Sequence, residues 1–158
     1  MKKTLDVKLI NPFLQATVEM FKNIAGMNLT IGKPELSDLV FSHEIYVVQA
    51  GLTGNLKGQI LLVYEENNAK KIASNMMGGM PVNELDEMAC SALNEMCNMI
   101  MGNSATIFST LDVFIDITPP ILLRGSKLEF KSDIQALKIP LVDSDGPVSE
   151  LYVCIAET

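Results

Sequence analysis

The chain has 158 residues, of which 48% are hydrophobic and 20% are charged, and its formal net charge is −7. This size fits one domain over residues 1–158, and the composition is that of a folded globular protein rather than a disordered one. The negative charge, without any Lys/Arg cluster, disfavours nucleic acid and anionic membranes as partners. No apolar run approaches the roughly 18 residues of a membrane helix, and Asp6 and Lys8 interrupt the stretch where a secretion signal would lie. We therefore expect a soluble cytoplasmic protein.

The first half of the chain predicts one helix followed by strands. Asn11 is a good N-cap, Pro12 suits the first helical position, and Gly26 favours a stop, so a helix is expected between them. Strands are expected near 28–35, 43–51 and 56–64. The last two are joined across Gly51-Leu-Thr-Gly54-Asn55, which is typical of a hairpin.

The second half repeats this order after a short helix. The short helix is expected at about 67–78, ending at Gly78-Gly79. A long helix follows, from near Asn83 to about Phe108, with Glu84, Asp86 and Glu87 in its first turn. Four strands are then expected near 111–118, 121–131, 134–142 and 149–156, with the turn Asp143-Ser-Asp-Gly146 between the last two.

This order of elements indicates an α+β fold. Short turns between successive strands favour antiparallel pairing, with the helices packed on one face of the sheet. Two similar segments, ILLVYEE and LYVCIAE, each follow a glycine turn. They suggest a duplicated unit that consists of one helix and several antiparallel strands.

The long helix has an apolar side and a polar side. At 3.6 residues per turn, the apolar side holds Leu85, Met88, Ala89, Ala92, Leu93, Met96 and Ile100. The polar side holds Glu87, Ser91, Asn94, Glu95, Asn98 and Gly102. Methionines are typical core residues, but Met99 and Met101 lie near the polar edge, where one of them could contact a partner. The pattern alone leaves two interpretations of the polar side open, a merely solvated surface or a functional site.

Four residues on the polar side are the candidates for such a site. Glu95 and Asn98 are three residues apart, so their side chains emerge as neighbours. Ser91 lies one turn before Glu95, and Gly102 lies one turn after Asn98. Asparagine and glycine are poor helix formers, and Gly102 would leave a flat spot that another backbone could approach.

The other chemistry-bearing residues form no recognisable metal or catalytic motif. Cys90 and Cys97 lie seven residues apart on one helix, about 10 Å in rise, which is too far for a disulfide. We expect both, together with Cys154, in the core. His43, the only histidine, begins a strand-like run and has no metal-ligand spacing. Phosphate-binding loops and nucleophile motifs are also missing, so no metal and no cofactor of its own is expected.

The polar face resembles the site of the CheC/CheX/FliY family of chemotaxis phosphatases, most closely the CheX type. That family's pattern is Asp or Ser, three residues, Glu, two residues, Asn, and a proline some twenty residues on. Here the pattern is met by Ser91, Glu95 and Asn98, with Pro119-Pro120 at about the right distance. The stretches INPFLQAT, GLTGNLKGQILLVY and NEMCNMIMGNSA are similar as well, so the resemblance covers nearly the whole chain.

The resemblance implies duplicated helix-plus-strands units around an antiparallel sheet. It implies a phosphatase that hydrolyses the aspartyl phosphate of a CheY-type response regulator, whose own Mg²⁺ and lysine take part. Asn98 would orient the attacking water, Glu95 would form a salt bridge to the partner's lysine, and Ser91 and Gly102 would shape the contact. A homodimer is typical of the CheX type.

CheC-type relatives carry a second site on the equivalent helix. Here the first helix offers Glu19 and Asn23 with three residues between them rather than two, and Gln15 where Ser or Asp would stand. We infer one site. The alternative function is a non-catalytic CheC-like adaptor that binds a response regulator or a flagellar switch component. A ligand-sensing or structural domain is a third, and it would have a deep apolar pocket and no exposed Asn98.

Overall fold

A computed structural model of the chain describes residues 6–158. Residues 1–5, at the start of the stretch considered above for a secretion signal, lie outside the described residues. The helices are η1 (Val7–Leu9), α1 (Asn11–Ala25), α2 (Glu66–Met76) and α3 (Glu87–Thr110). The strands are β1 (Thr30–Ile31), β2 (Glu35–Ser37), β3 (Val40–Phe41), β4 (Ile45–Gly54), β5 (Leu56–Tyr64), β6 (Ile115–Ile117), β7 (Ile121–Gly125), β8 (Leu128–Glu129), β9 (Ala136–Asp143) and β10 (Gly146–Glu157).

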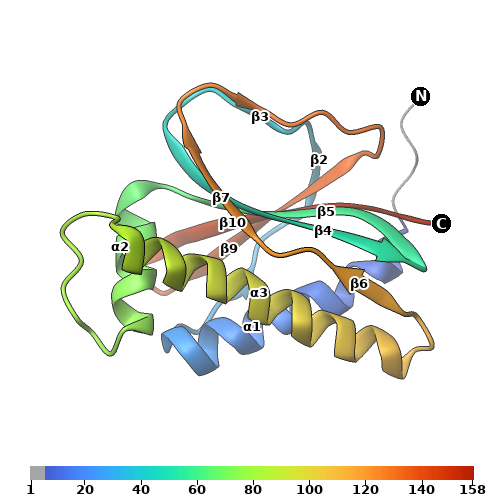
Figure 1. The fold of residues 1–158 in the computed structure, drawn as a ribbon, viewed down its shortest axis with the longest axis horizontal. Helices are drawn as coiled ribbons and strands as arrows, with labels where there is room; N and C mark the ends of the chain where they lie inside the picture. The colour runs from blue at the N-terminus through green and yellow to red at the C-terminus, as the bar shows by residue number, and fades with distance from the viewer. Residues whose placement is uncertain (1–5) are drawn as a thin grey trace.

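An antiparallel sheet forms the centre of the molecule. Its order is β1-β9-β10-β5-β4-β6, with β2 also paired to β9 and β7 also paired to β4. The short strands β3 and β8 form a separate pair. Helices α1, α2 and α3 lie on one side of the sheet, and β3 lies on the other (Figure 1). The predicted α+β class and antiparallel pairing are confirmed.

The central strands bury side chains on both faces. On β4 and β5, Val48 and Leu62 point toward the helices, while Val47 and Leu61 belong to a smaller cluster on the opposite face. All four have 0% exposure, which explains why these strands are almost continuously apolar. On the helical side, Phe13 of α1 meets Phe108 of α3 edge to face, with ring centroids 5.1 Å apart. This contact holds the two longer helices together over the sheet.

Two predicted helix starts are wrong, each for a local reason. Asn11 is the first residue of α1 but not its cap, because the 3₁₀ turn of η1 leads directly into the helix and Ile10 stands at the N-cap position without a side-chain bond. Helix α3 begins at Glu87 rather than near Asn83, because Asp86 caps it: its carboxylate accepts a hydrogen bond from the Ala89 amide at 2.9 Å. The predicted stop at Gly26 is confirmed, with a left-handed φ of 61°.

Some strands also differ from the prediction. The segment predicted as one strand at 28–35 forms the short strands β1 and β2, and the segment at 121–131 is divided between β7 and β8. The hairpin of β4 and β5 is confirmed, but its turn is at Gly54-Asn55, because Gly51 still pairs with Gln59 inside the ladder. Gly54 needs a positive φ of 106°, and an added Cβ would lie 2.6 Å from the Phe114 carbonyl oxygen.

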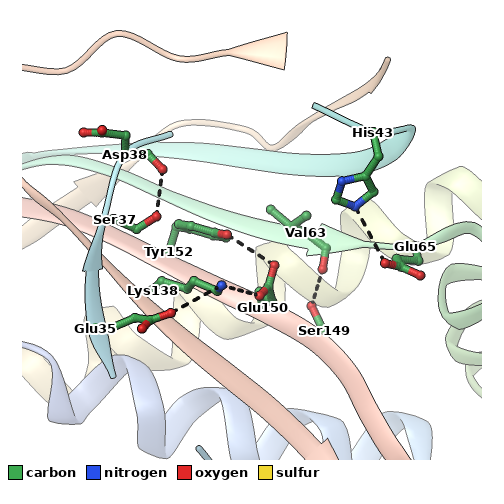
Figure 2. A network of polar contacts seen from close by, with 10 residues as sticks. All are labelled: Glu35, Ser37, Asp38, His43, Val63, Glu65, Lys138, Ser149, Glu150 and Tyr152. Carbon is green, nitrogen blue, oxygen red and sulfur yellow. Dashed lines mark hydrogen bonds and ion pairs between the residues drawn. The ribbon is translucent and has the colours of Figure 1, made fainter. Parts of the chain in front are cut away.

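The face of the sheet away from the helices carries charges that are paired within the chain (Figure 2). Lys138 Nζ lies 3.1 Å from one carboxylate oxygen of Glu150 and 3.5 Å from Glu35. The Tyr152 hydroxyl donates a hydrogen bond to Glu150 at 3.2 Å. The hydrogen bond that Lys138 itself donates to Glu150 is the main cause of the raised pKa of Lys138. His43 precedes β4, with its Nε2 3.7 Å from Glu65.

Candidate functional site

The outward face of α3 is set by the side chains that anchor its other side. Leu93, Met96, Cys97, Ile100 and Phe108 are at most 1% exposed. Burial of each large apolar side chain contributes roughly 1.5–3 kcal/mol, so a rotation of the helix that exposed them would cost several times that. The opposite residues must therefore face solvent. Ser91, Glu95 and Asn98 are exposed and Gly102 is partly exposed.

Glu95 and Asn98 form an outward pair on neighbouring turns of α3. Their spacing of three residues places the carboxylate beside the amide. Neither side chain makes a hydrogen bond or an ion pair with any residue in the described range 6–158. An exposed carboxylate and an exposed amide that are not used by the chain itself are available to a second molecule.

Gly102 lies on the same face and has room around it. It sits inside α3 without a positive φ, and apart from the adjacent backbone of α3 itself an added Cβ would meet no atom within 4 Å. Gly58 on β5 is the opposite case, because a Cβ there would lie 1.8 Å from the Cys154 carbonyl oxygen. The fold requires glycine at position 58. At position 102 it does not, so packing within the described residues does not account for this glycine.

Three residues of α3 lie elsewhere than the helical pattern predicts. Met88 was expected on the buried side but is 61% exposed, since the late start of α3 leaves it in the first helical turn, where the loop 77–86 runs beside it instead of the core. Met101, expected near the polar edge, is 1% exposed. Asn94, assigned to the polar side, is half-buried, and its Oδ1 has no hydrogen-bond partner among the described residues.

The corresponding glutamate of α1 is engaged within the chain. Glu19 accepts a hydrogen bond from the Asn103 side chain of α3 at 3.0 Å and another from Gln15 at 3.2 Å. These bonds, the one from Asn103 first, lower the pKa of Glu19. Sequence reasoning missed Asn103, because its partner lies 84 positions away and no local pattern marks it. Glu19 thus ties α1 to α3, whereas Glu95 is free of such a contact.

The cysteines near the site are poorly suited to act as nucleophiles. Cys97, the residue before Asn98, is fully buried, and burial raises the pKa of its thiol to about 12. Burial, and to a lesser degree Asp86, also raises the pKa of the half-buried Cys90. Since the thiolate is the reactive form, these two cysteines would be protonated near neutral pH. Cys154 is buried as well, so the core prediction is confirmed for Cys97 and Cys154 and is only partly right for Cys90.

Two further properties concern the described chain as a whole. Over residues 6–158 the structure contains no group of three or more His, Cys, Asp or Glu side chains arranged to hold a metal ion. Across the same range, none of the helices combines the length and the apolar character needed to span a membrane.

Solved structures share this fold over nearly the whole chain. A CheC-like superfamily protein from Shewanella sp. PV-4 matches with a TM-score of 0.83 and 26% sequence identity, covering 96% of this chain and 99% of that one. A CheX from Borrelia burgdorferi, in a crystal structure of the CheX-CheY-BeF₃-Mg²⁺ complex, matches with a TM-score of 0.79 and 27% identity over 96% of this chain and 100% of that one. The fold thus places the chain in the CheC-like class.

Sequence comparison narrows this class. The family model described as "Chemotaxis phosphatase CheX" matches residues 46–141, which include the whole candidate site. The CheY-P phosphatase CheX of Thermotoga maritima is 34% identical over 138 residues, covering 87% of this chain and 88% of the relative. The chain belongs to the chemotaxis phosphatase CheX family.

Proposed function

We propose that residues 1–158 act as a single cytoplasmic domain that hydrolyses the aspartyl phosphate of a CheY-type response regulator. The observation that carries this proposal is the exposed Glu95/Asn98 pair of α3, which has no partner within the described chain. Membership of the CheX family supports it, since the Thermotoga maritima relative is a CheY-P phosphatase and the Borrelia burgdorferi relative forms a complex with CheY.

In this proposal Asn98 positions the attacking water. A side-chain amide donates through its NH₂ group and accepts through its oxygen, so it can hold a water in line with the phosphorus–oxygen bond to the aspartate. The water oxygen bonds to phosphorus, the bond to the aspartyl oxygen breaks, and the products are a free carboxylate and inorganic phosphate. An amide is not a base, and the gain comes from orientation of the water.

Glu95 anchors α3 over the phosphoaspartate by an ion pair with a lysine of the response regulator. The Mg²⁺ that neutralises charge on the phosphoryl group is expected on the partner, so the chain needs no cofactor of its own. Ser91 and Gly102, on the same face of α3, shape the contact around this pair.

We also propose that the chain works as a homodimer, as is typical of the CheX type. The edge strand β2 offers one apolar contact for a second copy, since Leu36 is 69% exposed there. Sedimentation analysis should give a mass of about twice 17.3 kDa, and a monomer at all tested concentrations would contradict this assembly.

Release of phosphate from a labelled, phosphorylated CheY-type response regulator, with and without this chain, tests the proposed reaction. The wild-type chain should accelerate the release. Asn98→Ala should lower kcat at least a hundredfold, because the water is no longer oriented. The melting temperature should not fall, because the side chain is exposed and alanine is a better helix former. Glu95→Ala should mainly raise KM. An Asn98→Ala variant as active as the wild type would refute the assignment, and regulator binding without any acceleration would identify an adaptor instead.

A further inference from the structure

The negative charge of the chain is concentrated around α3. Residues 72–123, which include all of α3 and the segments on either side of it, contain six carboxylates and no Lys, Arg or His. Six of the seven net negative charges therefore lie in one third of the sequence. The carboxylates are Glu84, Asp86, Glu87, Glu95, Asp112 and Asp116.

Two carboxylates at the start of α3 are not paired with a cation of the described chain. Glu84 and Glu87 are exposed, and within residues 6–158 neither carboxylate takes part in a hydrogen bond or an ion pair. On the opposite face of the sheet, by contrast, Glu35 and Glu150 share Lys138 (Figure 2). Because like charges that are left together cost free energy unless a partner compensates them, the acidic start of α3 is a place where a basic partner would be favoured.

Two exposed methionines lie among these carboxylates. Met88 is 61% exposed and Met80, in the preceding loop, is 56% exposed. Both line a shallow hollow of about 250 Å³, together with Pro81, Val82 and Glu84. Exposed large apolar side chains are informative when they gather in one place, and methionine adapts well to a partner surface.

This hollow is continuous with the outward face of α3. Met88, Ser91, Glu95 and Asn98 succeed one another at steps of three or four residues and are all exposed, so they form one stripe along the helix. Met88 precedes Glu95 by seven residues, which is about 10 Å along the axis. A globular partner positioned over Asn98 is wide enough to reach Met88 as well.

We propose that Met80, Glu84, Glu87 and Met88 form an acidic–methionine patch that docks the response regulator. The patch fits a partner surface in which an apolar contact is surrounded by lysine or arginine. This inference rests on the proposed function and adds to it the chemistry by which one response regulator is chosen over others. The carboxylates accelerate encounter and exclude acidic surfaces, and Met88 lengthens the life of the complex by burying its side chain.

Steady-state dephosphorylation by the full chain, over a range of regulator concentrations, tests the patch. Met88→Gln should raise KM about tenfold, as expected for the loss of one apolar anchor, and should leave kcat within a factor of two. Glu84→Lys combined with Glu87→Lys should also raise KM and weaken its dependence on salt. Leu111→Gln is the matched control, because Leu111 is 60% exposed just beyond the other end of α3, and its KM should match that of the wild type.

The possible outcomes separate this inference from the proposed function. Wild-type KM values in both patch variants would overturn the patch, and so would an equal rise with Leu111→Gln or a fall in kcat alone. If one of these results were obtained while Asn98→Ala still lost turnover, the patch would be refuted and the proposed hydrolysis reaction would not be. Each variant can also be titrated with the response regulator loaded with beryllofluoride and Mg²⁺, and the changes in Kd should match the changes in KM. Melting temperatures of the variants verify that they are folded.

Discussion

Replacement of Gly102 by alanine should stabilise the protein and impair its activity at the same time. Glycine inside a helix costs about 0.8–1 kcal/mol relative to alanine. Beyond the adjacent backbone of α3, the new methyl group would meet no atom within 4 Å, and the backbone at this position needs no positive φ, so no steric clash offsets that gain. For a chain of this length, 1 kcal/mol corresponds to roughly 2–4 °C in melting temperature.

The opposite effect on activity follows from the proposed contact. If the response regulator approaches Gly102 closely, the added methyl group overfills the interface. Overpacking of this kind costs about 1–3 kcal/mol, which corresponds to a loss of roughly 5- to 150-fold in kcat/KM. Ser91→Ala, a change on the same face that removes an atom rather than adding one, is a suitable comparison and should be milder.

Calorimetric unfolding and steady-state dephosphorylation of the same preparation measure the two effects. A stabilised Gly102→Ala protein with wild-type kcat/KM would refute the close approach at this position. A destabilised protein would refute the structural reasoning, since it would mean that the space around Gly102 is occupied.

Two further substitutions test how α3 is held in place. Asp86→Ala removes the N-cap of α3 and should lower the free energy of unfolding by about 1 kcal/mol with kcat unchanged, and an unaltered denaturation midpoint would contradict the cap. Asn103→Ala removes the main cause of the lowered pKa of Glu19, so the pKa of that carboxyl, measured by NMR titration, should rise toward its ordinary value. A carboxylate with a lowered pKa in the folded state stabilises the protein above its unfolded pKa, about 4.3, and this contribution is lost as the pH falls. The difference in unfolding free energy between the wild type and Asn103→Ala should therefore shrink on acidification. A difference that stays constant with pH would contradict the hydrogen bond between Asn103 and Glu19.

Prediction from the sequence was most reliable where the backbone conformation depends on a single residue. Gly26 ends α1 and Gly146 begins β10 directly after the turn from β9, each with a positive φ. Both positions could be predicted because glycine adopts that conformation at little cost. The predicted start of α3 was four residues too early, because Glu84 and Glu87 are equally plausible in a first helical turn. The hydrogen bond that the Asp86 carboxylate accepts from the Ala89 amide fixes the start at Glu87.

The candidate site was marked by sequence and placed by packing. Ser91, Glu95 and Asn98 could be grouped on one face of a helix from their spacing alone, but the same spacing fits an ordinary solvated surface. Their outward orientation is decided by Leu93, Met96 and Ile100, which are buried against α1 and the sheet.

The sequence by itself determined the properties that depend on residues close together along the chain. These are the periodicity of the helices, the glycine turns, and the i, i+3 relation of Glu95 to Asn98. The tertiary structure decided which polar groups remain free. It engaged Glu19 with Asn103 and paired Lys138 with Glu35 and Glu150. It also left Met88 exposed where helical periodicity predicted burial. These outcomes depend on contacts between residues far apart in the chain, and no local pattern encodes them, because the free energy of burying or pairing a side chain is set by whatever the rest of the fold brings against it.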